Sequence, residues 1–146
     1  MTQQDSPVRP YAGDVDSATA WHRLENDENA VLIDVRTRAE WSFVGVPDLG
    51  RLTKQACFIE WQSYPEMQVN PNFLDEVAAA GVTAAQSLYL LCRSGARSAR
   101  AAEALTAAGY ARCFNVADGF EGPHDGEGHR GTITGWKAAG LPWRQG

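Results

Sequence analysis

Apolar and polar positions alternate along the chain in blocks that predict short buried strands separated by amphipathic helices. The run at 30–35, Ala-Val-Leu-Ile-Asp-Val, is typical of a strand buried on both faces of a parallel sheet. Further strands are predicted at 56–59, 88–91 and 112–116, helices at 14–25, 70–80 and 99–108, and short helical turns at 36–43 and 132–139. Strands that alternate with helices, without a hairpin signal, predict an α/β fold with a mostly parallel sheet covered on both faces.

The length of 146 residues indicates one domain. Residues 1–13 are polar and contain two prolines, so we expect a flexible N-terminal arm, followed by a single domain over 14–146. A segment rich in Gly and His, about 121–134, is expected to be an insertion within that domain.

Net charge and cysteine content indicate which partners and which cellular location to expect. The chain carries a formal charge of −5 and no basic run, so neither nucleic acid nor an anionic membrane is an expected partner. The N-terminal residues do not resemble a signal peptide, and no apolar run approaches the ~20 residues of a membrane span. Three scattered cysteines suit neither a disulfide framework nor a metal site. We expect a reducing, cytoplasmic location.

The stretch 88–100 changes from apolar to helical spacing around a loop that begins at Cys92. A cysteine between a strand and a helix N-terminus meets unpaired N–H groups and the positive end of the helix dipole, which favour the thiolate. Arg93 and Arg97 add positive charge, and Gly95 permits a positive φ that lets N–H groups converge on one anion. We therefore predict a reactive thiolate in an anion-binding loop, although most free cysteines are small buried hydrophobic residues.

Residues 92–98, Cys-Arg-Ser-Gly-Ala-Arg-Ser, resemble the active-site loop of the rhodanese (thiosulfate sulfurtransferase) family. The resemblance implies a three-layer rhodanese-like domain, a persulfide on Cys92 and main-chain N–H groups that hold the transferred sulfur. Four residues separate Cys92 from Arg97, as in the sulfurtransferases, whereas phosphatases of related shape have five and a wider loop. The expected substrate-binding residues are Arg93, Ser94, Gly95, Ala96, Arg97 and Ser98.

The resemblance covers roughly residues 14–143. Residues 32–36 with 40–41 are similar to the opening strand and turn of the family, and 114–120 with 135–142 are similar to its closing segments. Two features depart from it. Gly45-Val46-Pro47 lacks a histidine that the family often shows, and residues 121–134 separate closing segments that normally lie nearly adjacent.

Other polar residues are candidates for supporting roles. Asp34 and Arg36 follow a strand toward the same side as Cys92, where they could orient the loop, but a structural ion pair is the preferred interpretation. Arg93 is expected to point at substrate, whereas Arg97 either binds the anion or shapes the loop by binding carbonyls.

The histidines of the insertion, the insertion itself and the other two cysteines each have a structural and a functional interpretation. His124 and His129 could bind Zn²⁺ if their loop curled, but a solvated loop is favoured and no metal is predicted. The insertion could instead form a lid or partner surface. Cys57 and Cys113 are expected in the core.

The predicted activity is transfer of sulfane sulfur from thiosulfate, or a similar small anionic donor, through a Cys92 persulfide to cyanide or a thiol, without a cofactor. Two alternatives stay open. One is a persulfide carrier that exchanges sulfur with a relay protein, and the other is a cysteine-dependent phosphatase or arsenate reductase.

Overall fold

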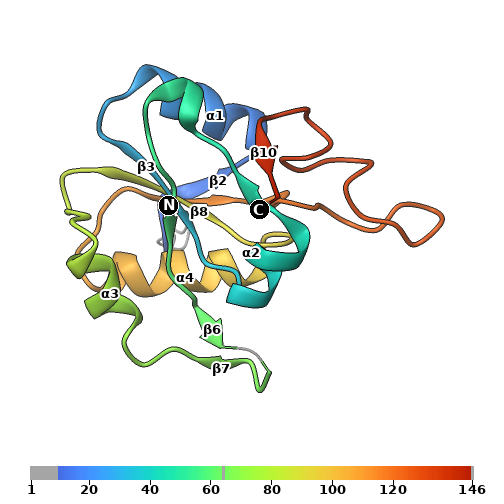
Figure 1. Cartoon of the computed structure of the whole chain (residues 1–146). Helices are drawn as coiled ribbons and strands as arrows, with labels where there is room; N and C mark the ends of the chain where they lie inside the picture. The colour runs from blue at the N-terminus through green and yellow to red at the C-terminus, as the bar shows by residue number, and fades with distance from the viewer. Residues whose placement is uncertain (1–9, 64, 146) are drawn as a thin grey trace, which may run out of the picture.

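A five-stranded sheet forms the centre of the computed structural model, which describes residues 10–63 and 65–145 (Figure 1). Its strands run in the order β2-β9-β8-β3-β5, and each neighbouring pair is parallel. Their bounds are Gly13–Val15 for β2, Cys113–Val116 for β9, Ser87–Leu91 for β8, Ala30–Asp34 for β3 and Cys57–Phe58 for β5. The predicted α/β class with a mostly parallel sheet is confirmed.

Side chains of the central strands alternate between two cores, one on each face of the sheet. Along β8, Leu88 and Leu90 enter one core, whereas Tyr89 and Leu91 enter the other. All five residues of β8 are buried, as expected for a strand that has helices on both sides. The apolar run at 88–91 therefore reflects burial on both faces.

Helices cover the two faces of the sheet (Figure 1). On one side α1 (Ser17–Asn26) packs through Ala20 and Leu24. On the other side α3 (Phe73–Ala79) and α4 (Ala96–Ala107) pack through residues such as Val77 and Leu105. Helix α2 (Arg38–Val44) and the short η1 (Gly50–Leu52) lie in the connection from β3 to β5.

The prediction of a flexible N-terminal arm over 1–13 is wrong for Ala12 and Gly13, which pair with β9. The Ala12 N–H donates to the Cys113 carbonyl at 2.9 Å, and β2 then pairs with β9. Helix α1 begins at Ser17, later than predicted, because the Asp16 side chain caps it by accepting from the Thr19 N–H at 2.7 Å. Residues 1–9 of the expected arm lie outside the described residues.

Other boundaries also differ from the sequence-based expectation. Helix α4 begins at Ala96, three residues early, so Arg97 and Ser98 lie in its first turn. The stretch 132–139 begins with bends, and the predicted helical turn is found only in its C-terminal part, where the Ala139 N–H donates to the Gly135 carbonyl at 2.9 Å. Two short antiparallel pairs had no sequence signal: β4 (Val46–Pro47) with β10 (Trp143–Arg144), and β6 (Gln62–Ser63) with β7 (Gln68–Val69).

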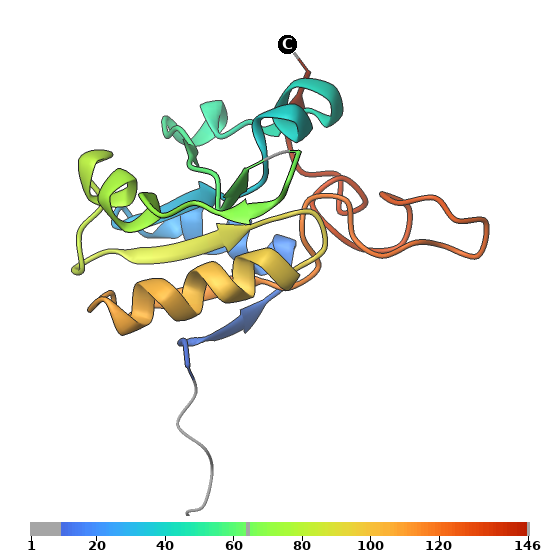
Figure 2. The same ribbon diagram turned by 90° about the horizontal axis from the view of Figure 1, so that it is seen from below.

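The expected insertion projects from the domain as a long loop, drawn in orange-red in Figure 2. Asp125 organises its tip by accepting hydrogen bonds from the His129 N–H at 2.9 Å and the Thr132 hydroxyl at 2.7 Å. None of the helices in residues 10–63 and 65–145 has the length and apolar character of a membrane span.

Candidate active site

The loop that begins at Cys92 lies where β8 ends and α4 begins, at the carboxyl edge of the parallel sheet, where such sheets bind ligands. Gly95 has a φ of 105°, and a Cβ there would collide with the Ala117 carbonyl. The loop is also tied to the following segment, because the Phe120 N–H donates to the Cys92 carbonyl at 2.8 Å. Glycine at 95 therefore lets the loop sit tightly against residues that follow β9.

The Cys92 sulfur has two hydrogen-bond donors. The Gly95 N–H and the Ser98 Oγ each lie 3.1 Å from Sγ. Only 1% of the residue is exposed, yet it lines the cavity beside α4. The first-turn N–H groups of α4 have no side-chain cap and lack partners within the helix, so the positive helix end adds to these donors. The arrangement stabilises negative charge on sulfur at the floor of a cavity.

Ser98 links this sulfur to a buried amide. Its hydroxyl lies 2.5 Å from Oδ1 of Asn115, which is itself buried on β9. The Asn115 Nδ2 donates to the Gly95 carbonyl at 3.2 Å and to Asp14 Oδ1 at 3.1 Å, and these two bonds fix the orientation of the amide. Because a hydroxyl has one proton, Ser98 can donate either to the sulfur or to Asn115 at a given moment.

Among residues 10–63 and 65–145, the hydrogen-bond partner of the Arg97 side chain is Glu40 rather than a carbonyl of the loop. Its guanidinium donates to both oxygens of Glu40, at 2.6 and 2.8 Å. Burial would raise the pKa of the Glu40 carboxyl, but hydrogen bonds from Arg97 and Thr37 lower that pKa to about 2. The same pair raises the pKa of Arg97 against the effect of burial. The ion pair joins α4 to α2 along one side of the cavity.

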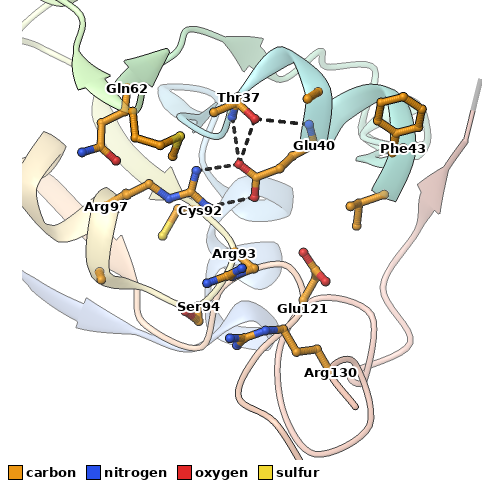
Figure 3. A pocket seen from close by; sticks show the side chains of 14 residues that line it. Thr37, Glu40, Phe43, Gln62, Cys92, Arg93, Ser94, Arg97, Glu121 and Arg130 are labelled. Atoms are coloured by element: carbon orange, nitrogen blue, oxygen red, sulfur yellow. Dashed lines mark hydrogen bonds and ion pairs between the residues drawn. The ribbon is translucent and has the colours of Figure 1, made fainter. Parts of the chain in front are cut away.

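A cavity of about 800 Å³ opens above Cys92 (Figure 3). One part of its lining is apolar and comes from α2 and the β6–β7 connection. The other part is charged and comes from the loop and the insertion. The apolar lining residues are Ala39, Phe43, Val44 and Met67, and the charged residues other than the Glu40–Arg97 pair are Arg93, Glu121 and Arg130.

Asp34 and Arg36 form a buried ion pair, with 2.7 Å between Oδ2 and Nη2. Arg36 also donates to the Gly45 carbonyl at 2.9 Å, and its guanidinium lies over the Phe120 ring. Neither residue lines the cavity. The pair therefore supports the edge of the sheet behind the loop, because Phe120 is also hydrogen-bonded to Cys92.

The other cysteines and the histidines of the insertion lie apart from this cavity. Cys57 and Cys113 pack in or against a core, and burial raises the pKa of both thiols. No three His, Cys, Asp or Glu side chains in residues 10–63 and 65–145 gather closely enough to hold a metal ion. The electrostatic setting of Cys92, with two directed donors, is different from that of either core thiol.

Four charged or polar residues near the site were not predicted from the sequence. Glu40 carried a detectable signal, because Thr37 and Glu40 have the spacing of a capping box, and the structure contains that box. Its position also places the carboxylate near α4, which spacing along the chain does not reveal. Asn115 looked like part of a strand, and Glu121 and Arg130 lie in the insertion, whose path had no local signal.

The family model that describes the STR4 middle domain matches residues 13–146. The chain belongs to this family of rhodanese-like domains. The match includes β2, the strand that the sequence-based prediction missed, and extends through the insertion. The family assignment and the arrangement of the Cys92 loop agree with the predicted fold.

Individual relatives of this rhodanese-like domain cover nearly its whole length. The crystal structure of Rv0390 from M. tuberculosis has a TM-score of 0.85 and 49% identity, and the match covers 93% of this chain and 99% of that one. An uncharacterized protein of Rickettsia conorii is 39% identical over 132 residues, 88% of this chain and 94% of its own. A sulfurtransferase of Allochromatium vinosum is 28% identical over 129 residues, 88% of this chain and 92% of its own.

Proposed function

We propose that this rhodanese-like domain transfers sulfane sulfur from thiosulfate, or a similar small anionic donor, through a persulfide on Cys92. The observation that carries the proposal is the pair of donors, the Gly95 N–H and the Ser98 hydroxyl, at 3.1 Å from Sγ on the cavity floor. Membership of the family and the resemblance to a named sulfurtransferase support the same reaction class.

In the first half-reaction, the Cys92 thiolate attacks the outer sulfur of thiosulfate. A new S–S bond forms to Cys92, the S–S bond of thiosulfate breaks, and sulfite leaves with the electron pair. The negative charge moves to the terminal sulfur of the persulfide, next to the N-terminal turn of α4. Arg93 is exposed, lines the cavity and contributes positive charge where the anionic donor enters.

In the second half-reaction, an acceptor nucleophile attacks the terminal sulfur. With cyanide the product is thiocyanate; with a thiol R–SH it is the persulfide R–S–SH, and the thiol proton ends on the transferred sulfur. The bond between Cys92 Sγ and that sulfur breaks, and Sγ regains its electron pair as a thiolate. Buried hydrogen-bond donors around Sγ lower the energy of this leaving thiolate.

The position of Arg97 favours sulfur transfer over phosphoryl chemistry. A cysteine phosphatase needs a positively charged group directed at the phosphate. The two terminal nitrogens of Arg97 are instead bound to the two carboxylate oxygens of Glu40. A short loop with four residues between Cys92 and Arg97 points the same way.

Thiocyanate formation from thiosulfate and cyanide tests the proposed function. We expect turnover by the wild type, none by Cys92→Ala, and no hydrolysis of p-nitrophenyl phosphate by either protein. A dedicated carrier that serves a relay protein would turn over free thiosulfate very poorly but would still accept sulfur from a persulfidated partner. Near-wild-type turnover by Cys92→Ala contradicts the proposal.

A further inference from the structure

The cavity above Cys92 is much larger than its smallest proposed substrate. Thiosulfate has five atoms, whereas about 800 Å³ lies within the range of sites that hold drug-sized organic ligands. The extra space has two kinds of lining, one charged and one apolar. The size and lining of the cavity therefore fit a substrate with a carbon skeleton and a charged group.

Two guanidinium groups line the same part of this cavity. Arg93 extends from the loop, and Arg130 extends from the insertion, where its Nη1 donates to the Gly122 carbonyl at 2.7 Å. Figure 3 draws both groups on the side of the pocket formed by Ser94 and Glu121. Within residues 10–63 and 65–145, neither arginine has a carboxylate within salt-bridge distance.

Glu121 reduces this positive charge but does not remove it. With Arg97 and Glu40 neutralising one another, Arg93, Arg130 and Glu121 leave one positive charge in excess at the cavity. The whole chain has the opposite sign, at −5. Two neighbouring guanidinium groups in an acidic protein favour an anionic group of the ligand, which can bind one or both of them.

The remaining side of the cavity is apolar. Phe43 is 82% exposed, an unusual degree for a phenylalanine, and Met67 is 36% exposed. Both line the cavity together with Ala39 and Val44. In Figure 3 the Phe43 side chain, which extends from α2, lies away from Arg93 and Arg130, so a ligand that reaches Cys92 can contact both linings.

We propose that the sulfur acceptor is an organic thiol that carries a carboxylate on an apolar carbon chain, and that Arg130 selects it by binding the carboxylate. The inference rests on the proposed function and adds the class of acceptor and a specificity-determining residue. The acceptor thiol takes the terminal sulfur from the Cys92 persulfide and becomes R–S–SH, its proton moving to the transferred sulfur, while Cys92 returns to the thiolate.

The first test uses alkylation of Cys92, because it does not depend on persulfide chemistry. Iodoacetate and iodoacetamide deliver a carboxylate or a neutral amide to the same sulfur, and the modified Cys92 peptide is quantified by mass spectrometry. We expect the ratio of the two rates to fall about tenfold in Arg130→Gln. Arg51→Gln, an exposed position on η1 outside the cavity, removes the same charge and should leave the ratio unchanged.

The second test measures discharge of the persulfide by thiols. Protein loaded from thiosulfate and freed of sulfite is mixed with 3-mercaptopropionate or 2-mercaptoethanol at equal thiolate concentrations. We expect a preference of about tenfold for the carboxylate in the wild type and in Arg51→Gln, and little preference in Arg130→Gln. With 6-mercaptohexanoate the rate should rise further in the wild type, but not in Phe43→Ser, because the longer chain reaches the apolar lining.

The outcomes separate the two proposals. Failure to load sulfur from thiosulfate overturns the proposed function, while the alkylation ratio still decides whether Arg130 selects carboxylates. An alkylation ratio that is the same in the wild type and in Arg130→Gln overturns the inference even if loading is normal. Equal discharge by the charged and neutral thiols in the wild type also overturns it.

Discussion

Arg97 binds the Glu40 carboxylate through both terminal nitrogens of its guanidinium, at 2.6 and 2.8 Å, and so fixes the first turn of α4 against α2. Both side chains are largely buried, with 16% and 19% exposed. The contact joins residues that are 57 positions apart and borders the cavity above Cys92. The sequence left Arg97 open to anion binding or to shaping the loop, and in the structure its guanidinium is bound to Glu40 beside the Cys92 loop.

Replacing Glu40 with Gln should destabilise the fold at neutral pH. Gln keeps an acceptor for Thr37 but loses the charge that Arg97 binds, so we expect a loss of about 1–3 kcal/mol in the free energy of unfolding, measured with urea. The Glu40 pKa is about 2 in the folded chain and about 4.5 without these contacts, so its contribution is complete above pH 4.5 and falls as the pH approaches 2.

The difference between the wild type and Glu40→Gln should therefore shrink by more than half between pH 7 and about pH 3. Glu103→Gln is the matched control, since Glu103 pairs with Arg100 on the exposed side of α4. That change should cost less than about 0.5 kcal/mol. A loss in Glu40→Gln that does not change with pH would show that the ion pair is not its cause.

Ser98→Ala should slow sulfur transfer without preventing it. The substitution removes one of two donors to Sγ but keeps the Gly95 N–H, so we expect about a tenfold lower rate of loading from thiosulfate in stopped-flow or quenched mass measurements. Thr106→Val removes another hydroxyl of α4, which donates to the Ala102 carbonyl and lies beside the core thiol Cys113 rather than Cys92, and it should load at the wild-type rate. Equal loading by Ser98→Ala and the wild type would assign Ser98 to packing alone.

Gly95→Ala should be far more damaging than a comparable glycine substitution. Gly95 and Gly109 have φ angles of 105° and 109°, but a Cβ at Gly95 would collide with the Ala117 carbonyl, whereas a Cβ at Gly109 meets nothing within 4 Å. We expect Gly109→Ala to cost about 1–2 kcal/mol and Gly95→Ala to cost about 1–3 kcal/mol more in thermal unfolding. If the two variants unfolded at the same temperature, the close contact between the loop and residue 117 would contribute nothing to stability.

The central strands and the position of Cys92 could be predicted because their signals are local. The apolar run at 88–91 is continuous because β8 is buried on both faces, and the change to helical spacing after it marks the edge where Cys92 lies. Strand β2 escaped prediction because it has only three residues, Gly13–Val15, of which one is buried. Its pairing with β9 depends on a segment about a hundred positions away.

The partners of the site residues could not be read from spacing. Glu40 and Arg97 meet only when α2 and α4 are folded against the same edge, and the Ser98–Asn115 contact crosses from α4 to β9. Arg130 and Glu121 belong to an insertion whose path is set by hydrogen bonds such as the one from the Gly131 N–H to the Glu121 carbonyl, at 2.6 Å. The pairing of Asp34 with Arg36 was expected because two positions on one strand end suffice to define it.

Intact-mass spectrometry after mixing the protein with thiosulfate decides whether Cys92 carries the transferred sulfur. We expect the wild type to gain the mass of one sulfur atom, peptide mapping to place it on Cys92, and cyanide to remove it. Cys92→Ser should gain nothing, although Cys57 and Cys113 are still present. A folded wild-type protein that gains no sulfur, or a Cys92→Ser variant that gains as much, would show that Cys92 does not form the persulfide.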